Sequence, residues 1–338
     1  MLWYWPKVQV VMKCTWSDGR PRPSSEDRIS SSVSARVHCF TAGRSRVAGA
    51  QVTLGTNDEV AFCRSDHQAV VRRMSELARD MERQSGEESF TSGRTCPDCV
   101  ETIREAKLIQ TSLLPTHGFR NESVDIAFRF TPFSDVGGDF VDFFRLPDGL
   151  IGIYLGDVVG KGLSAAMFGA LVMGTLRGIH KSGTDTARVL FLLNERLVHR
   201  PIRGRFCSTL YALFNPVPRE LIFSNAGMPL PLLVSGSACR QLGEGGLPSG
   251  MFPGSTYGRH VVQLVPGDCV LLATDGLHEL RNGEGVEFCS AHMEEAWAQC
   301  RRKSATESAD FVFDRQVAFS DGSVPHDDIS VVVLKVLH

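Results

Sequence analysis

The chain has 338 residues, of which 43% are hydrophobic and 22% charged, and its formal net charge is −2. These values are typical of a soluble globular protein with room for about two domains. The nearly balanced charge argues against a general nucleic-acid-binding surface, so we expect no nucleic-acid partner. No apolar run reaches the roughly 18 residues that a membrane span needs, and the apolar start lacks the basic segment of a signal peptide. The ten cysteines show no framework spacing, which is typical of reduced thiols in a cytoplasmic protein.

The first 65 residues carry few clear signals. Residues 20–34 are rich in Ser, Pro and Arg, which favours a flexible segment. Short mixed runs, such as residues 47–54, are compatible with strands but too few to define a known domain. We therefore treat 1–65 as a partly flexible N-terminal segment, and a start site placed too far upstream is an alternative explanation for it.

Two amphipathic helices are expected next, within a linker over residues 66–115. In the first, 66–84, apolar residues recur every three or four positions, at Val70, Met74, Leu77 and Met81. Residues 98–114 repeat the pattern, and Pro115 ends it. Such helices either form a homodimer through residues 66–114 and relay a signal, or pack on the domain that follows; the pattern alone favours neither.

From residue 120 to the C-terminus the pattern becomes rich in strands. The expected strands are 124–130, 139–146, 150–156, 206–214, 221–224, 231–234, 260–264, 268–274 and 329–336. The expected helices are 162–180, 185–199, 291–302 and 306–318. Blocks of strands separated by pairs of helices predict an α+β domain over 120–338, an antiparallel sandwich covered by helices.

Four acidic turns lie at the ends of predicted strands. The first is Gly137-Gly138-Asp139, where two glycines let the backbone approach an ion closely and the aspartate supplies a hard oxygen ligand. The second, 156–162, carries Asp157 at the end of an apolar strand and then Gly160-Lys161-Gly162 at the start of a helix. Alone, each is more often an ordinary turn than a ligand.

The other two acidic turns lie far downstream. Asp275 stands where an apolar strand becomes a helix, and Asp327-Asp328 opens the last strand. Gathering this many carboxylates in one place costs free energy unless cations compensate the charge. The four turns together therefore predict a divalent metal centre.

Six motifs in this part of the chain resemble the metal-dependent PPM-type serine/threonine phosphatases, in particular their bacterial branch, which includes the sporulation stage II phosphatase and acts on sigma-factor regulators. They cover 109–115, 136–140, 156–162, 225–227, 273–277 and 327–330. The resemblance spans roughly 235 residues, one domain-sized block. It implies a four-layer αββα sandwich and a cytoplasmic protein phosphatase of bacterial signal transduction.

The resemblance also implies roles for individual residues. Asp139, Asp157, the Val158 carbonyl, Asp275 and Asp327 would hold two Mn²⁺ or Mg²⁺ ions, and Asp139 and Asp157 would act in catalysis through the water that the ions share. Gly138 and Asp328 would support these ligands from outside the set. The substrate would be a phosphorylated regulatory protein of the anti-anti-sigma type.

The chain departs from the family pattern at three places. Met228 stands where this branch usually has His, and His278 stands where Thr is common. Eukaryotic relatives carry a phosphate-binding Arg just before the first acidic turn, where this chain has Ser134, with Arg129 further back; the bacterial branch also tends to lack that Arg. Lys161 and the helix amides from Gly162 onward are therefore the candidates for binding phosphate. The unusual Met228 and His278 motivate an alternative function, a catalytically idle regulator that binds its phosphorylated partner.

Overall fold

The computed structural model describes four strands within residues 1–54 and most of residues 97–337, with gaps at 181–184, 237, 285, 287, 289 and 321–326. The chain forms two compact units, Met1–Phe62 and Cys63–His338. The predicted helix 66–84 lies outside the described residues. The division at residues 65 and 115 therefore stays a prediction.

The N-terminal unit contains one antiparallel sheet in the order β1-β2-β3-β4. Its strands are β1 (Leu2–Trp5), β2 (Val8–Met12), β3 (Val33–Cys39) and β4 (Val52–Leu54). β4 falls within the run at 47–54 in which the sequence allowed a strand.

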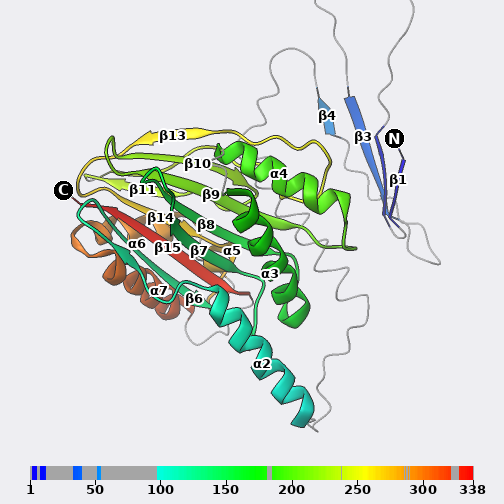
Figure 1. Ribbon diagram of the computed structural model, residues 1–338, viewed down its shortest axis with the longest axis horizontal. Helices are drawn as coiled ribbons and strands as arrows, with labels where there is room; N and C mark the ends of the chain where they lie inside the picture. Colours follow the sequence, from blue (N-terminus) through cyan, green and yellow to red (C-terminus); the bar gives the residue numbers. More distant parts are fainter. Residues whose placement is uncertain are drawn as a thin grey trace, which may run out of the picture. The chain divides into compact units, whose positions relative to one another are not determined.

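The second unit is built on two antiparallel sheets (Figure 1). The five-stranded sheet has the order β13-β10-β9-β8-β7, with β7 (Phe140–Arg145), β8 (Ile151–Val158), β9 (Cys207–Asn215), β10 (Glu220–Ala226) and β13 (His260–Gln263). The six-stranded sheet has the order β12-β11-β14-β15-β6-β5, with β5 (Phe119–Arg120), β6 (Val124–Thr131), β11 (Leu232–Ser235), β12 (Ala238–Gln241), β14 (Cys269–Ala273) and β15 (Ile329–Val336).

Helices cover the outer face of each sheet (Figure 1). α3 (Gly162–Ile179) and α4 (Thr186–His199) pack on the five-stranded sheet. α6 (Ser290–Ala298), the 3₁₀ helix η2 (Gln299–Arg302) and α7 (Ala305–Ser320) pack on the six-stranded sheet. α2 (Pro97–Leu113) lies against α3, and the short α5 (Asp275–His278) follows β14. The predicted αββα sandwich is confirmed.

Three apolar layers hold the sandwich together. The central layer lies between the sheets and includes Ile153, Phe214 and Val332, each at most 2% exposed. The two outer layers lie between each sheet and its helices. Because helices cover both outer faces, inner strands such as β14 and β15 are apolar at nearly every position and do not alternate.

α3 is the one described helix that is long and apolar enough, by length and composition, to cross a membrane. It buries one face, including Phe168, Val172 and Leu176, against the five-stranded sheet. This is the packing of a core helix, which passes the same test of length and hydropathy.

Candidate metal centre

The acidic turns occupy the ends of paired strands. Asp139 directly precedes β7, and Asp157 lies in the last two residues of β8, which pairs with β7. Asp275 begins α5 directly after β14, and Asp327 and Asp328 directly precede β15, which pairs with β14. The fold thus brings one pair of acidic turns from each sheet into one neighbourhood.

The Asp328 carboxylate, at the start of the last strand, is hydrogen-bonded to the first acidic turn. It accepts hydrogen bonds from the backbone N–H groups of Phe133 at 2.6 Å, Gly138 at 2.5 Å and Asp139 at 3.4 Å. A carboxylate that accepts several backbone N–H bonds is held in one orientation. Asp328 therefore positions the turn that carries Asp139.

Glycines are needed here because the backbones approach so closely. A methyl group on Gly137 would lie 2.3 Å from Asp328 Oδ2, and one on Gly276 would lie 2.0 Å from the Asp328 carbonyl oxygen. A methyl group on Gly138 would lie 2.8 Å from the Val158 carbonyl oxygen and 3.3 Å from Asp157 Oδ1. The Gly-Gly and Asp-Gly pairs therefore let all four turns meet.

Asp139 is the most deeply buried of these carboxylates, with 2% of its surface exposed. Its Oδ2 accepts a hydrogen bond from Thr274 Oγ1 at 2.9 Å, whereas its buried Oδ1 has no hydrogen-bond partner among the described residues. Desolvation, and then the charge of Asp328, raises the pKa of Asp139 well above its usual range. An orphaned carboxylate oxygen among other carboxylates is a fitting ligand for a cation.

Asp157 is likewise affected by burial and by the charges of neighbouring aspartates. Burial raises its pKa most, and the charges of Asp275, Asp139, Asp327 and Asp328 raise it further. Among the residues that the structure describes, however, no three Asp, Glu, His or Cys side chains converge closely enough to form a ready-made metal site. The carboxylates are thus close enough to shift one another's pKa, but their side chains would have to reorient before they could bind the same ion.

The loop from Val158 to Gly162 leads from this cluster into α3. Gly160 and Gly162 have φ values of 104° and 68°, a region that favours glycine. Lys161 between them contacts Asp327 Oδ2 at 3.5 Å and lies over the Phe133 ring. No described side chain caps the start of α3, so its first amides, from Gly162 onward, are uncapped within the described structure.

Arg205 was not among the predicted site residues, although it supports this loop. Its guanidinium donates to the Val159 carbonyl oxygen and to Ser164 Oγ at 2.7 Å. Thr274 was missed as well: its hydroxyl donates to Asp139 and accepts from Ser330 N at 2.9 Å. Neither contact leaves a spacing signal in the sequence, since the partners lie far apart along the chain.

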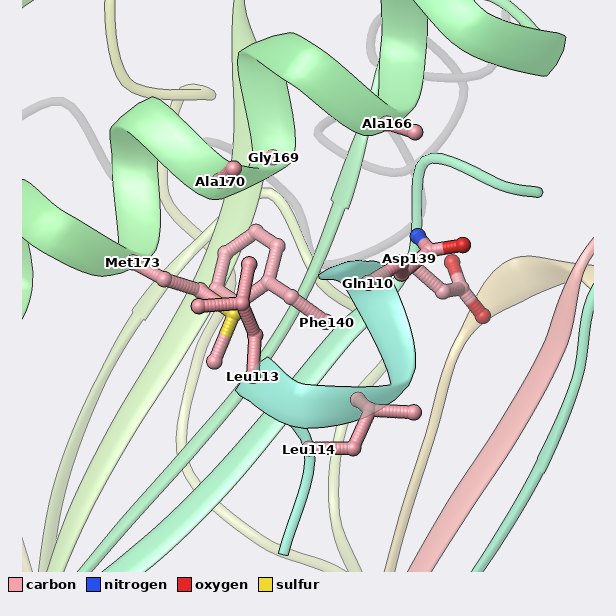
Figure 2. A pocket seen from close by; sticks show the side chains of 9 residues that line it. All are labelled: Gln110, Leu113, Leu114, Asp139, Phe140, Ala166, Gly169, Ala170 and Met173. Atoms are coloured by element: carbon pink, nitrogen blue, oxygen red, sulfur yellow. The ribbon is translucent and has the colours of Figure 1, made fainter. Parts of the chain in front are cut away.

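The last turns of α2 contact the first acidic turn, Gly137-Gly138-Asp139, through Gln110. Gln110 Nε2 donates to the Gly137 carbonyl oxygen at 2.7 Å, and Gln110 Oε1 accepts from Gly137 N at 3.1 Å. Figure 2 shows Gln110 and Asp139 side by side in the small crevice between α2 and α3, whose apolar part is lined by Leu113, Phe140 and Met173. The linker helix thus holds the backbone at Gly137, two residues before Asp139.

The two unusual residues, Met228 and His278, have other surroundings than the carboxylates of the cluster. Met228 is 4% exposed and packs in the core between the sheets, where the Asn225 side chain bonds both its N–H and its carbonyl oxygen. His278 contacts the Thr274 carbonyl oxygen, and desolvation lowers its pKa. Neither residue replaces a carboxylate of the cluster.

Solved structures share this architecture. The SiaA-PP2C domain of Pseudomonas aeruginosa superposes with a TM-score of 0.62 at 20% identity, covering 70% of this chain and 97% of that domain. The PP2C phosphatase domain of SpoIIE from Bacillus subtilis gives 0.57 at 20% identity, covering 65% and 64%. The fold is therefore that of the PP2C-type phosphatase domains.

The sequence comparison is more specific. The model of the family described as Stage II sporulation protein E (SpoIIE) matches residues 147–337, so the chain belongs to the SpoIIE family. The predicted resemblance is confirmed. The phosphoserine phosphatase RsbU of Bacillus subtilis is 25% identical over 235 residues, which are 69% of each protein. Protein IcfG of Synechocystis sp. is 26% identical over 260 residues, 69% of this chain but only 41% of IcfG.

Proposed function

We propose that the chain is a metal-dependent serine/threonine protein phosphatase that hydrolyses phosphoserine or phosphothreonine on a regulatory protein of the anti-anti-sigma type. The observation that carries this is the buried Asp139, whose Oδ1 has no hydrogen-bond partner in the described part of the chain while the neighbouring carboxylates repel it. Cations compensate such a cluster best. The relative RsbU, a phosphoserine phosphatase by name, supports the reaction class.

Asp139, Asp157, the Val158 carbonyl, Asp275 and Asp327 would hold two Mn²⁺ or Mg²⁺ ions. When bound, such a pair lowers the pKa of a water nucleophile and offsets the charge of the phosphoryl group. The residues around it do the positioning: Asp328 and Gln110 hold the turn before Asp139, and Thr274 orients its carboxylate. Lys161 and the uncapped amides from Gly162 face the same region and would bind phosphate oxygens.

The test is phosphate release from a phosphoserine peptide and from p-nitrophenyl phosphate, with Mn²⁺ and with chelator. Mn²⁺-dependent release that is lost in Asp157→Asn supports the proposal. Equal release by the two proteins would remove the proposed centre.

The second candidate is a catalytically idle regulator that binds a phosphorylated partner. The observation that favours it is that no three carboxylates converge on one ion position within the described part of the chain. Phosphopeptide binding without any release of phosphate, even with excess Mn²⁺, would support this second candidate over the phosphatase.

Regulation would enter through the linker helices, by pairing of 66–114 between two protomers. Support comes from α2, which holds Gly137 and exposes the large apolar side chains of Val100, Leu108 and Ile109. Removing residues 1–95 would then change both the number of protomers per particle, measured by light scattering, and the specific activity. An unchanged monomer of unchanged activity would contradict this.

A cytoplasmic location is part of the same proposal, since the described cysteines are free thiols.

A further inference from the structure

A strongly basic segment lies beside the proposed centre without taking part in it. This segment, 196–205 and here termed the arginine segment, runs from the last turn of α4 to the start of β9 and contains Arg196, Arg200, Arg203 and Arg205. No Asp or Glu occurs between residues 196 and 219. In a chain of net charge −2, such a local excess of one sign is a distinct surface feature.

Helix electrostatics explains only part of this charge. Cations in the last turn of a helix interact favourably with its dipole, which accounts for Arg196. The effect fades within a turn, so it does not account for Arg203, which lies beyond the helix. No ion pair joins Arg196, Arg200 or Arg203 to any acidic side chain among the described residues, and all three are exposed.

The C-terminal end of this segment lies beside the proposed metal centre. Arg205 bonds Val159 and Ser164, the residues on either side of the Lys161 turn. The next residues enter β9, where Cys207 and Ser208 pair with Val158 and Asp157. Ile202 between the arginines is 49% exposed and adds an apolar contact point. A protein whose phosphate entered at Gly162 would therefore meet this segment with the residues that flank its phosphorylated side chain.

We propose that the arginine segment docks an acidic stretch of the substrate protein, so that the enzyme selects phosphorylated side chains flanked by Asp or Glu. The inference rests on the proposed function and specifies its substrate class. Exposed charges of opposite sign raise the rate of encounter and fix register, and salt weakens them. The Arg205 guanidinium is already hydrogen-bonded to Val159 and Ser164, so Arg200 and Arg203 are the residues that bind the acidic stretch.

The experiment uses the full chain and two labelled phosphoserine peptides of equal length, one flanked by Asp and Glu and the other by Lys. Fluorescence anisotropy measures the Kd of each. We expect the wild type to bind the acidic peptide about tenfold more tightly, which corresponds to about 1.4 kcal/mol, and the preference to shrink as salt rises. The double variant Arg200→Glu/Arg203→Glu should lose or invert the preference.

The matched control is Arg301→Glu/Arg302→Glu, which makes the same charge change at exposed positions of η2, on the other helical layer. It should keep the wild-type preference. Equal Kd values for the two peptides in the wild type, no measurable binding of either, or tighter binding of a single-stranded oligonucleotide than of the acidic peptide would overturn the inference.

Phosphate release separates this result from the proposed function. The Mn²⁺-dependent rate on p-nitrophenyl phosphate, which has no flanking residues, should be the same in the wild type and both double variants. Peptide discrimination without any Mn²⁺-dependent release would remove the phosphatase and keep the docking surface. Mn²⁺-dependent phosphate release together with equal binding of the two peptides would keep the phosphatase and remove the docking surface.

Discussion

Two buried aspartates of this domain are compensated in different ways. Asp125, on β6, is 6% exposed, and its Oδ2 contacts Arg120 at 3.3 Å and accepts from Ala305 N, at the start of α7, at 3.1 Å. Asp139 is 2% exposed, keeps an orphaned Oδ1 and faces further carboxylates. Described groups of the protein satisfy Asp125, whereas Asp139 Oδ1 has no hydrogen-bond partner among the described residues. The first carboxylate serves the fold and the second the proposed chemistry.

The largest expected effect is on activity. Asp139→Asn and Asp157→Asn should each lower Mn²⁺-dependent phosphate release by at least about a thousandfold, since the substituted amide no longer offers a charged ligand. Asp125→Asn should leave the rate per folded molecule unchanged. A steady-state assay on circular-dichroism-matched samples measures both, and comparable losses in all three variants would erase the distinction.

Backbone crowding gives the next largest effect. Gly276→Ala places a methyl group 2.0 Å from the Asp328 carbonyl oxygen, so a backbone must move. We expect a loss of about 2–4 kcal/mol in the free energy of unfolding, together with lower Mn²⁺ affinity. Gly174→Ala on α3 is the control, because no described atom outside the local helix backbone lies within 4 Å of the added carbon. It should be neutral or slightly stabilising, because alanine favours a helix.

The two aspartates should also differ in the sign of their effect on stability. Asp125→Ala removes the contact at the start of α7 and should destabilise the chain by about 1–2 kcal/mol. Asp139→Asn removes a repelled charge and should raise the melting temperature of the metal-free chain. Thermal melts with chelator measure both, and a lower melting temperature for Asp139→Asn would show that the repulsion is compensated within the protein.

The pH dependence follows from the raised pKa values of Asp139 and Asp157. Between the unfolded and the folded pKa the native state holds more protons than the unfolded state, so metal-free stability falls as pH rises through that window. Mn²⁺ competes with those protons, so the stabilisation by Mn²⁺ should grow with pH. Denaturant titrations with and without Mn²⁺ check this; a Mn²⁺ increment that is constant with pH would contradict it.

The smallest expected effect concerns Gln110. Gln110→Ala removes two hydrogen bonds to Gly137 from a half-exposed site and should change stability by less than about 1 kcal/mol. Activity should still fall by about tenfold, because the turn before Asp139 loses a support. The neighbouring Thr111→Ala, which breaks only a bond to Lys107 within α2, should keep wild-type activity. Equal rates in all three proteins would show that α2 does not position the turn.

Much of the fold followed from periodicity and turn residues. The last strand is Ile329–Val336 as predicted, and the helix expected at 162–180 is Gly162–Ile179. The short strands β5 and β12 were not predicted, since two and four residues carry too little pattern. The Gly-Asp turns pointed to the site, but Thr274, Gln110 and Arg205 act through hydrogen bonds to segments far away along the chain. Only the tertiary fold creates those contacts.

The side-chain amide of Gln110 contacts Gly137 much as one strand contacts the next, with one donor and one acceptor. A helix turns by about 100° and rises about 1.5 Å per residue. If α2 slid or rotated by a single residue, its amide would face away from Gly137, and both bonds would be lost together. The orientation of a helix outside the sandwich can therefore decide, in one discrete step, whether the loop before the buried aspartate is held in place.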